Sequence, residues 1–225
     1  MKKYSVAIDG PAGAGKSTIA KLLAKELGFY YVDTGAIYRT LGYFMDLVGI
    51  GPKDIDGITR MIDEVVIEIE YDEDGSQHMF MNEIDVTEDI RSPEMSKIAS
   101  GISAHKLVRD TLLDMQRDMA KKHNVIMDGR DIGTVVLPRA DVKFFLTASP
   151  EVRAQRRCAE LQAKGSKDSY DKVLKEIIQR DYDDSHRAVA PLKQTKSHIL
   201  VDTSDMTIEQ VVAEMGRIVR EKCKL

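Results

Sequence analysis

The apolar residues of this chain alternate between short continuous runs and longer stretches with a spacing of three and four. Short apolar runs occupy residues 4–8, 29–32, 125–127, 142–146 and 198–201. Such runs are typical of buried parallel strands, and the periodic stretches between them predict amphipathic helices. Strands that alternate with helices indicate an α/β fold, in which helices cover both faces of a parallel sheet. Ligands of such folds bind at the carboxyl ends of the strands.

Capping residues mark several of the predicted helix boundaries. Gly28 ends the first periodic stretch, as glycine commonly does after the last helical turn. Ser92 followed by Pro93 indicates a helix start with proline at its first position. Thr207 and Gln210 have capping-box spacing, which predicts the start of the last helix.

The pattern changes between about residues 60 and 90. Residues 65–71 and 78–86 are strand-like, and they flank the turn sequence DEDGS. They predict a small antiparallel hairpin that a third strand could extend. Because the hairpin follows a helical stretch at residues 35–48 and interrupts the strand–helix alternation, we expect it to be an inserted subdomain.

Composition limits the class of protein and its partners. The chain has 225 residues, enough for one large domain or a core with a subdomain. A net charge of −4 with 31% charged residues gives no overall positive field, which disfavours duplex nucleic acid and anionic membranes as partners. Two cysteines, Cys158 and Cys223, are typical of a reducing compartment. The first ten residues are too short for a signal-peptide core, so we expect a soluble cytoplasmic protein.

The segment GPAGAGKS directly follows the first apolar run and opens a helical stretch. Its glycines allow successive backbone N–H groups to point at phosphate oxygens near the positive end of the helix. Lys16 would reach the β- and γ-phosphates, and Ser17 would offer a hydroxyl to Mg²⁺. A glycine-rich turn that binds nothing is the alternative. The predicted ATP-binding residues of this phosphate-binding loop (P-loop) are Gly10, Pro11, Ala12, Gly13, Ala14, Gly15, Lys16, Ser17 and Thr18.

Polar residues gather where the second predicted strand ends. Asp33 and Thr34 close the strand, and Arg39 lies on the helix that follows. Thr34 could serve as the helix N-cap, since threonine often does. A guanidinium at this edge of the sheet favours an anion-binding role for Arg39.

A second polar cluster follows the run at residues 125–127. Asp128 lies where P-loop proteins often place a carboxylate near the metal, so either Asp33 or Asp128 would hold Mg²⁺ through water. Arg130, beside Gly129, is well placed to bind a phosphate with two hydrogen bonds. A structural network of ion pairs is the alternative.

Two later helical stretches carry arginines in register. One set is Arg153, Arg156 and Arg157, and the other is Arg180, Asp184 and Arg187. Charged helix faces are usually solvated, but like charges on one face repel unless an anion neutralises them. The KGS segment at residues 164–166 resembles a mobile tip between the two stretches. Residues of about 150–187 are therefore predicted to form a helical lid that closes over phosphates.

Phosphoryl transfer explains why arginines would come from a lid. The rate depends on aligning donor and acceptor and on neutralising the charge of the moving group, while water must be excluded. The predicted catalytic residues are Lys16, Arg130, Arg157, Arg180 and Arg187, with Arg157 also contacting ATP.

Together with GPAGAGKS, three segments resemble signature sequences of the bacterial cytidylate kinases, a family of nucleoside monophosphate kinases. They are DTGAIYR at residues 33–39, DGRDIGTVV at 128–136 and RAVAPL at 187–192. The resemblance covers about residues 4–215. It implies a P-loop NTPase-like parallel sheet in a single kinase domain, residues 1–225, and a monomer. Residues of about 35–120, including the β insert, would form the monophosphate-binding region.

The resemblance also implies transfer of the γ-phosphoryl group of ATP to CMP or dCMP, with Mg²⁺. By position, the acceptor nucleotide would contact Thr34, Arg39, Ser100, Arg109, Arg130, Asp131, Arg180, Asp184 and Arg187. Ser100, Arg109 and Asp131 would read the cytosine edge, since a carboxylate can accept from the amino group that uracil lacks.

The remaining acceptor contacts divide between sugar and phosphate. The resemblance places Asp184 and Arg180 at the sugar. It places Arg39, Arg130 and Arg187 at the α-phosphate. Because the acceptor phosphate is itself the attacking anion, no side-chain nucleophile or general base is expected.

Other kinases of the same class and two other classes of protein use a similar loop. An adenylate, thymidylate or shikimate kinase is the nearest, and the predicted cytosine-reading residues argue against it. A GTPase-type switch would need an Asn-Lys-x-Asp segment after a late strand, where this chain reads LKQTKSHILVD. An ATP-driven motor acting on nucleic acid would need a basic surface, which the net charge disfavours.

Overall fold

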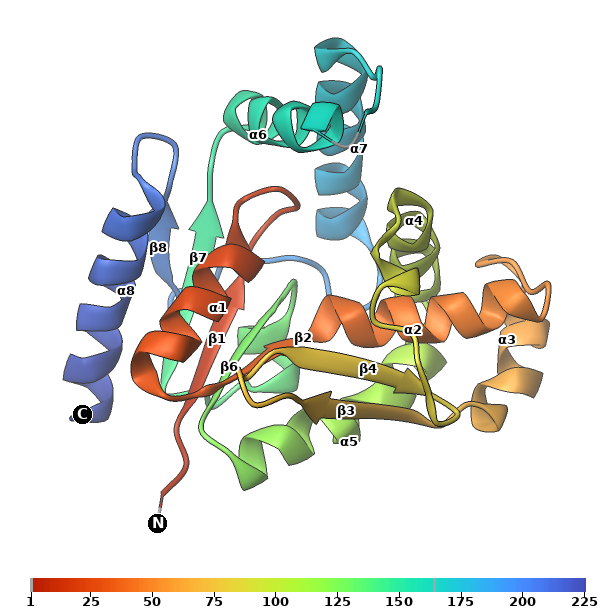
Figure 1. The fold of residues 1–225 in the computed structure, drawn as a ribbon, viewed down its shortest axis with the longest axis horizontal. Helices are drawn as coiled ribbons and strands as arrows, with labels where there is room; N and C mark the ends of the chain where they lie inside the picture. The colour runs from red at the N-terminus through yellow and green to blue at the C-terminus, as the bar shows by residue number, and fades with distance from the viewer. Residues whose placement is uncertain (1, 164) are drawn as a thin grey trace.

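A five-stranded parallel sheet forms the centre of the molecule, in the order β2-β6-β1-β7-β8 (Figure 1). The computed structural model describes residues 2–163 and 165–225. The strands are β1 Ser5–Asp9, β2 Tyr30–Asp33, β6 Val125–Gly129, β7 Val142–Thr147 and β8 Ile199–Asp202. Each predicted apolar run forms one of them, and every neighbouring pair is parallel. The predicted α/β fold is therefore confirmed.

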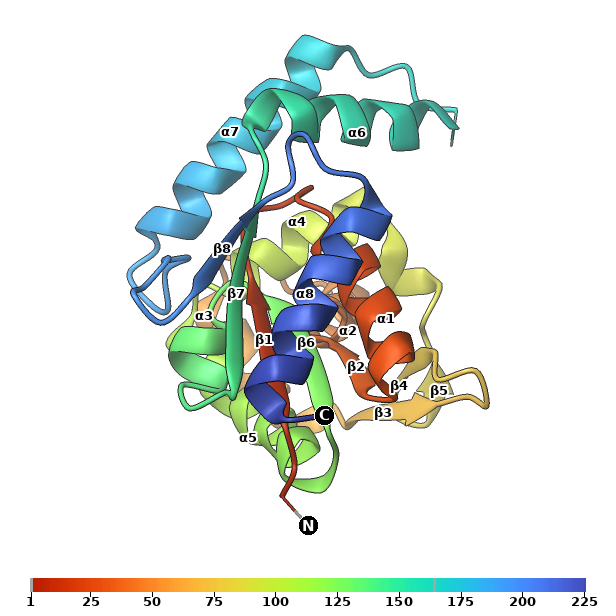
Figure 2. The same cartoon turned by 90° about the vertical axis from the view of Figure 1, so that its left-hand side faces the viewer.

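Helices cover both faces of this sheet (Figure 2). They are α1 Lys16–Leu27 and α8 Ile208–Cys223 on one face, and α2 Thr34–Leu47 and α5 Lys106–Lys122 on the other. Successive side chains of a strand point to opposite faces. Accordingly, Val6 and Ile8 of β1 pack in the cluster with α1 and α8, whereas Ala7 packs in the cluster with α2 and α5.

The predicted helix caps are present. Gly28 has a left-handed φ of 66° and its N–H donates to Ala24 O. Ser92 is the N-cap of α4 (Pro93–Ile102), and its side chain accepts from the N–H of Met95. Both halves of the capping box at the start of α8 are made, between Thr207 and Gln210. These local signals were readable because each depends on residues only a few positions apart.

The inserted segment forms a separate three-stranded antiparallel sheet. Its strands are β3 Ile67–Tyr71, β4 Gln77–Met81 and β5 Ile84–Asp85. The third strand is present, but the prediction of one strand over residues 78–86 is wrong, because Asn82 and Glu83 have positive φ and form a turn within that run. Ile67, Met79 and Met81 belong to the same buried cluster as Ile37 and Leu41 of α2. The insert therefore packs on the core. The sequence did not predict the helical segments on either side of it, α3 Ile55–Met61, η1 Ile62–Glu64 and η2 Asp89–Arg91.

Two further helices, α6 Pro150–Ala163 and α7 Tyr170–His186, lie above the carboxyl ends of the central strands (Figure 1). They pack on each other through a small cluster of their own: Ala154, Cys158, Val173 and Ile177. The predicted helix register of Arg180, Asp184 and Arg187 is wrong in one part. Arg187 follows the last helical residue and is extended, with ψ of 143°. Lys164 of the KGS segment lies outside the described residues.

Two remaining features are a short helical turn and the cysteines. A single π-helical turn, η3, spans Ile132–Val136 directly after Asp131. Cys158 and Cys223 are both buried and unpaired by disulfide. Within residues 2–163 and 165–225, no helix is both long and apolar enough to cross a membrane.

Candidate active site

The P-loop joins β1 to α1 at the carboxyl edge of the sheet. Gly10 has φ of 153°, and a Cβ there would lie 2.0 Å from Leu146 O, so only glycine fits beside β7. Gly15 has a left-handed φ of 83° and is the N-cap of α1. The Nζ of Lys16 lies over the loop and donates to Pro11 O at 2.7 Å. The loop therefore surrounds the helix N-terminus with backbone groups and one cation, as a phosphate site requires.

Lys16 is in an environment that disfavours its charge. Burial lowers the pKa of Lys16, and the nearby positive charge of Arg130 lowers it further, although Asp128 opposes both. A buried ammonium with a cation beside it gains from an added anion. The electrostatics of Lys16 thus favour a phosphate in the loop.

Asp128 lies at the end of β6 beside the first turn of α1. Its carboxylate accepts from the Ser17 hydroxyl and from the Tyr31 hydroxyl, each at 2.9 Å. Burial raises the pKa of Asp128, as does the charge of Asp33. Among the described residues, no cluster of three or more His, Cys, Asp or Glu is arranged to hold a metal ion. At this edge of the sheet, the Ser17 hydroxyl lies beside the Asp128 carboxylate.

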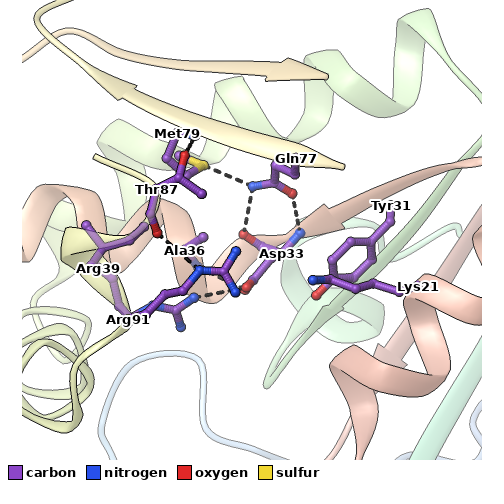
Figure 3. Close-up of a pocket in the computed structure, with 10 residues that line it drawn as sticks. Lys21, Tyr31, Asp33, Ala36, Arg39, Gln77, Met79, Thr87 and Arg91 are labelled. Carbon is purple, nitrogen blue, oxygen red and sulfur yellow. Dashed lines mark hydrogen bonds and ion pairs between the residues drawn. The ribbon is translucent and has the colours of Figure 1, made fainter. Parts of the chain in front are cut away.

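The end of β2 differs from the sequence-based alternative for Thr34. The N-cap of α2 is Asp33, whose Oδ1 accepts from Ala36 N at 2.9 Å. Thr34 instead donates its hydroxyl to Asp128 O at 2.7 Å, which ties β2 to β6. The second oxygen of Asp33 accepts from Arg39 Nη2 at 2.9 Å (Figure 3). Asp33 therefore orients Arg39, and Asp128 is the carboxylate next to Ser17.

Two arginines of the predicted acceptor site are incompletely bonded. Of the described residues, only Arg39, Arg180 and Gln116 have a buried polar side-chain atom without a hydrogen-bond partner. The atom is Nε in both arginines. Buried polar groups are normally paired, and an unpaired buried donor is costly. Arg39 and Arg180 therefore each have one buried donor that no described protein group satisfies.

Further guanidinium groups surround Arg180. Burial, followed by repulsion from Arg130, lowers the pKa of Arg180 to about 10, and Arg39 and Arg157 add to this effect. Arg130 itself is neutralised by Asp184, to which its Nε donates at 2.6 Å. Arg39 and Arg130, two of the predicted phosphate-binding arginines, therefore lie near Arg180, whereas the third, Arg187, contacts Asp131.

A second group of charged residues lies around Asp131. The Nη2 of Arg109 donates to one carboxylate oxygen of Asp131, and Arg187 Nη2 reaches the other at 3.5 Å. Arg109 also donates to Ser103 O at 3.2 Å. A cavity of about 240 Å³ adjoins this group, and its lining includes Tyr38, Leu113 and Val189. The pair predicted to read the base therefore lies beside an open volume.

Ser100 is less closely tied to this group than the sequence implied. It lies on α4, where its carbonyl accepts from the Ser103 hydroxyl at 2.9 Å. Within residues 2–163 and 165–225, its own hydroxyl makes no hydrogen bond to Arg109 or Asp131. The role of Ser100 stays a prediction.

The arginine set on α6 is not a single anion site. Arg153 is buried and forms a double ion pair with Asp181 of α7, at 2.6 and 3.0 Å, and it also donates to Ala12 O of the P-loop. Arg156 donates to Thr203. The expectation that all three arginines need an anion is wrong, because two have protein acceptors from distant segments. Arg157 contacts Glu160 on the surface, and its contact with ATP stays a prediction.

Asp9 is a buried residue next to the P-loop, and the sequence analysis did not single it out. Its carboxylate accepts from the N–H groups of Ile132 and Gly133 at 2.7 and 2.8 Å, and it bonds His198 Nε2 at 3.1 Å. It thereby joins the residue before the P-loop to the turn after Asp131. A charged residue that ends an apolar run directly before the loop was the available signal.

A P-loop that faces a cluster of arginines across the carboxyl edge of a parallel sheet defines a P-loop phosphotransferase. Comparison with known proteins narrows this class. The family model for cytidylate kinase matches residues 6–221. The chain therefore belongs to the cytidylate kinase family.

Two relatives illustrate this membership. The cytidylate kinase of Clostridium tetani is 47% identical over 214 residues, which cover 95% of this chain and 92% of the relative. That of Carboxydothermus hydrogenoformans is 48% identical over 217 residues, covering 96% and 97%. The family resemblance stated from the sequence motifs is confirmed. Neither the AMP or dTMP kinases nor the switch proteins gain support.

The fold is shared with more distant proteins. A crystal structure of an uncharacterized protein from Eubacterium ventriosum aligns with 96% of this chain and 98% of its own, with a TM-score of 0.52. At 12% sequence identity, this likeness concerns the fold alone.

Proposed function

We propose that this kinase transfers the γ-phosphoryl group of ATP to CMP or dCMP, giving CDP or dCDP and ADP. The observation that carries the acceptor half of the proposal is the pair of unpartnered buried Nε atoms on Arg39 and Arg180. They lie within a group of guanidiniums that lowers the pKa of Arg180. A nucleoside monophosphate supplies a dianionic phosphate that would bind Arg39, and sugar oxygens that can accept a hydrogen bond from Arg180.

The donor would occupy the P-loop. The backbone N–H groups at the start of α1 and the Nζ of Lys16 would bind the β- and γ-phosphates. Lys16 donates to Pro11 O in the structure, so it would exchange this carbonyl for a phosphate oxygen. The charged partner would raise the lowered pKa of Lys16 and hold it protonated.

Ser17 and Asp128 would hold Mg²⁺, with Asp128 acting through water. Magnesium binds few protein groups and keeps several waters and substrate phosphates as ligands, so a hydroxyl beside one carboxylate fits it. The 2.9 Å contact between Ser17 and Asp128 supports this choice over Asp33, whose carboxylate is occupied by Arg39 and the α2 N-terminus. Bound Mg²⁺ would neutralise charge on the β- and γ-phosphates.

The acceptor would lie between the arginines near Arg180 and those that contact Asp131. Arg39, Arg130 and Arg187 would bind its α-phosphate, and Arg180 and Asp184 its sugar. Because Arg130 is held by Asp184 at 2.6 Å, phosphate and sugar recognition would be coupled through that ion pair.

The Arg109–Asp131 pair would recognise the cytosine base. Asp131 is 4% exposed and can accept a hydrogen bond from the exocyclic amino group, while Arg109 and Ser100 can donate to the ring nitrogen and carbonyl. A uracil carbonyl facing the Asp131 carboxylate would leave two acceptors opposed. Rejection of an analogue that leaves buried polar groups unpaired is strong.

The reaction needs no protein nucleophile. An oxygen of the acceptor phosphate would form the new bond to the γ-phosphorus, and the bond between this phosphorus and the β–γ bridging oxygen would break. Lys16 and the arginines would neutralise the three oxygens of the moving group. Closure of α6 and α7, which have a small core of their own, would exclude water from it.

The proposal is tested by an ADP-release assay with a panel of nucleoside monophosphates. We expect rapid turnover with CMP and dCMP and much slower turnover with UMP, AMP and dTMP. Rapid turnover with AMP or dTMP and none with CMP would overturn the cytosine assignment. ADP release without any acceptor would contradict the role given to the arginines.

A further inference from the structure

The outer edge of the central sheet exposes backbone groups close to the acceptor site. β2 is the edge strand, paired only with β6 in the described sheet. Tyr30 N donates to Asn124 O at 2.8 Å, so this residue faces the neighbouring strand. In a parallel strand alternate residues bond to opposite sides, which directs the N–H and C=O of Tyr31 and Asp33 away from β6. Such edge groups need other partners when they are buried.

Side chains of the insert bind these edge groups. Tyr71 and Gln77 are opposite each other on β3 and β4, beside the turn of the hairpin. The Tyr71 hydroxyl donates to Tyr31 O at 2.8 Å. Gln77 accepts from Asp33 N at 2.7 Å through Oε1, and its Nε2 donates to Asp33 O at 3.4 Å (Figure 3). The buried Gln77 amide therefore pairs with Asp33 as the backbone of another strand would.

Asp33, whose main chain Gln77 holds, in turn contacts Arg39 through its side chain. One carboxylate oxygen of Asp33 caps α2 and the other binds Arg39 Nη2 at 2.9 Å. Gly35 leaves little free space between them, because a Cβ there would meet Arg39 Nη1 at 3.0 Å and Asp33 Oδ1 at 3.1 Å. A displacement of the Asp33 backbone would therefore move the guanidinium of Arg39.

We propose that Gln77 is a positioning residue of the acceptor site. It holds the main chain of Asp33, and through the Asp33 carboxylate it sets where Arg39 meets the acceptor's phosphate. Gln77 itself does not contact the nucleotide. The insert thus controls the affinity for the acceptor indirectly, through Asp33 and Arg39. This inference rests on the proposed role of Arg39 in binding a nucleoside monophosphate.

The first test replaces Gln77 by a residue of similar length without the amide. Gln77→Met should raise the KM for CMP by about 3- to 10-fold, the equivalent of one net hydrogen bond, and leave kcat and the KM for ATP unchanged. Tyr71→Phe removes a single hydroxyl and perturbs packing least, so it should shift the KM for CMP in the same direction by a smaller factor. An unchanged KM for CMP in both variants would overturn the inference.

A control variant in the same hairpin distinguishes positioning from stability of the insert. Asn82 accepts from Val66 N at 2.7 Å in the β4–β5 turn, and its φ of 48° suits glycine. Asn82→Gly removes this bond and the weaker one from Asn82 Nδ2 to Glu64 O at 3.4 Å without altering Gln77 or Asp33, and it should leave the KM for CMP unchanged. If Asn82→Gly raises the KM as much as Gln77→Met does, Gln77 has only a structural role.

A double-mutant cycle with Arg39 tests the proposed route. In an Arg39→Lys background, Gln77→Met should add little to the KM for CMP, because its effect passes through the Arg39 guanidinium. Additive effects would overturn the inference while leaving the proposed function intact. Absence of CMP phosphorylation by the unmodified protein would instead contradict the proposed function itself.

Discussion

The hydroxyl of Ser17 donates to the carboxylate of Asp128 at 2.9 Å, although the two residues lie 111 positions apart in the chain. Ser17 belongs to the first turn of α1, and Asp128 lies near the end of β6, which pairs with β1. Parallel pairing of β1 and β6 brings the P-loop and the carboxylate to one edge of the sheet. This contact is the basis for assigning Mg²⁺ to Ser17 and Asp128.

Replacement of Asp128 should weaken magnesium binding. Asp128→Asn removes the charge but retains the shape, and loss of such an outer-sphere group typically costs about 10- to 100-fold in metal affinity. We expect the Mg²⁺ concentration for half-maximal activity to rise accordingly. Asp33→Asn should act on the KM for CMP instead, through Arg39. The reverse pattern would assign the metal to Asp33.

Replacement of Asp131 should relax selection of the base. The amide of Asp131→Asn can donate to the uracil carbonyl, so the ratio of kcat/KM for CMP to that for UMP should fall by at least about tenfold, the free energy of one well-placed hydrogen bond to a charged group. Competition between the two substrates measures this ratio. An unchanged ratio would show that Asp131 does not read the base.

Replacement of Asp184 should affect ribonucleotides most. Asp184→Ala leaves Arg130 without its 2.6 Å partner, so activity with both CMP and dCMP should fall. The loss should be larger for CMP, because only the ribonucleotide offers a 2′-hydroxyl to the carboxylate. Parallel kcat/KM measurements decide this, and equal losses on the two substrates would count against the sugar contact.

Replacement of Arg153 and of Arg157, which both lie on α6, should have different effects. Arg157→Ala should lower kcat with little change in stability, since arginines that neutralise the transferred group contribute about 10³- to 10⁵-fold in rate. Arg153→Met should instead lower the free energy of unfolding, because it leaves Asp181 and the Ala12 carbonyl without their partner. Urea titrations and kcat for both variants provide the comparison. A loss of kcat in Arg153→Met alone would reverse the two roles.

Gly133 should not tolerate a side chain. A Cβ there would lie 2.7 Å from His198 Nε2 and 3.2 Å from Asp9 Oδ2, and overpacking of a buried site costs about 1–3 kcal/mol. Gly133→Ala should therefore lower the free energy of unfolding by that amount. Gly75→Ala in the hairpin turn is no suitable control, because its φ of 78° adds backbone strain. Gly51→Ala, with no atom near its Cβ and no positive φ, should have a much smaller effect.

Local patterns predicted most of the fold. The five apolar runs became the five strands, and the caps at Gly28, Ser92 and Thr207 lie where the sequence indicates. These features depend on residues close together in the chain. The P-loop was equally readable, because its geometry is determined by a few consecutive residues between β1 and α1.

The parts that were missed depend on contacts between distant segments. Arg153 resembles a solvated or anion-seeking arginine in sequence, but Asp181 lies 28 positions away and Ala12 lies 141 positions away. Asp9 and Gln77 likewise acquire their roles from partners that no local pattern reveals. Composition and periodicity cannot show which polar side chain will meet which backbone group. Tertiary packing brings these partners together: α6 against α7 and the P-loop for Arg153, the turn after Asp131 and the segment before β8 for Asp9, and the insert against β2 for Gln77.

The most direct test of the central claim follows the phosphoryl group itself. Purified protein is mixed with ATP labelled in its γ-phosphate, Mg²⁺ and CMP, and the labelled products are separated. We predict that the label appears in CDP at the rate at which ADP forms. Label recovered only as inorganic phosphate would contradict the account. In a parallel reaction that contains equal amounts of CMP and AMP, label in ADP in preference to CDP would contradict it as well.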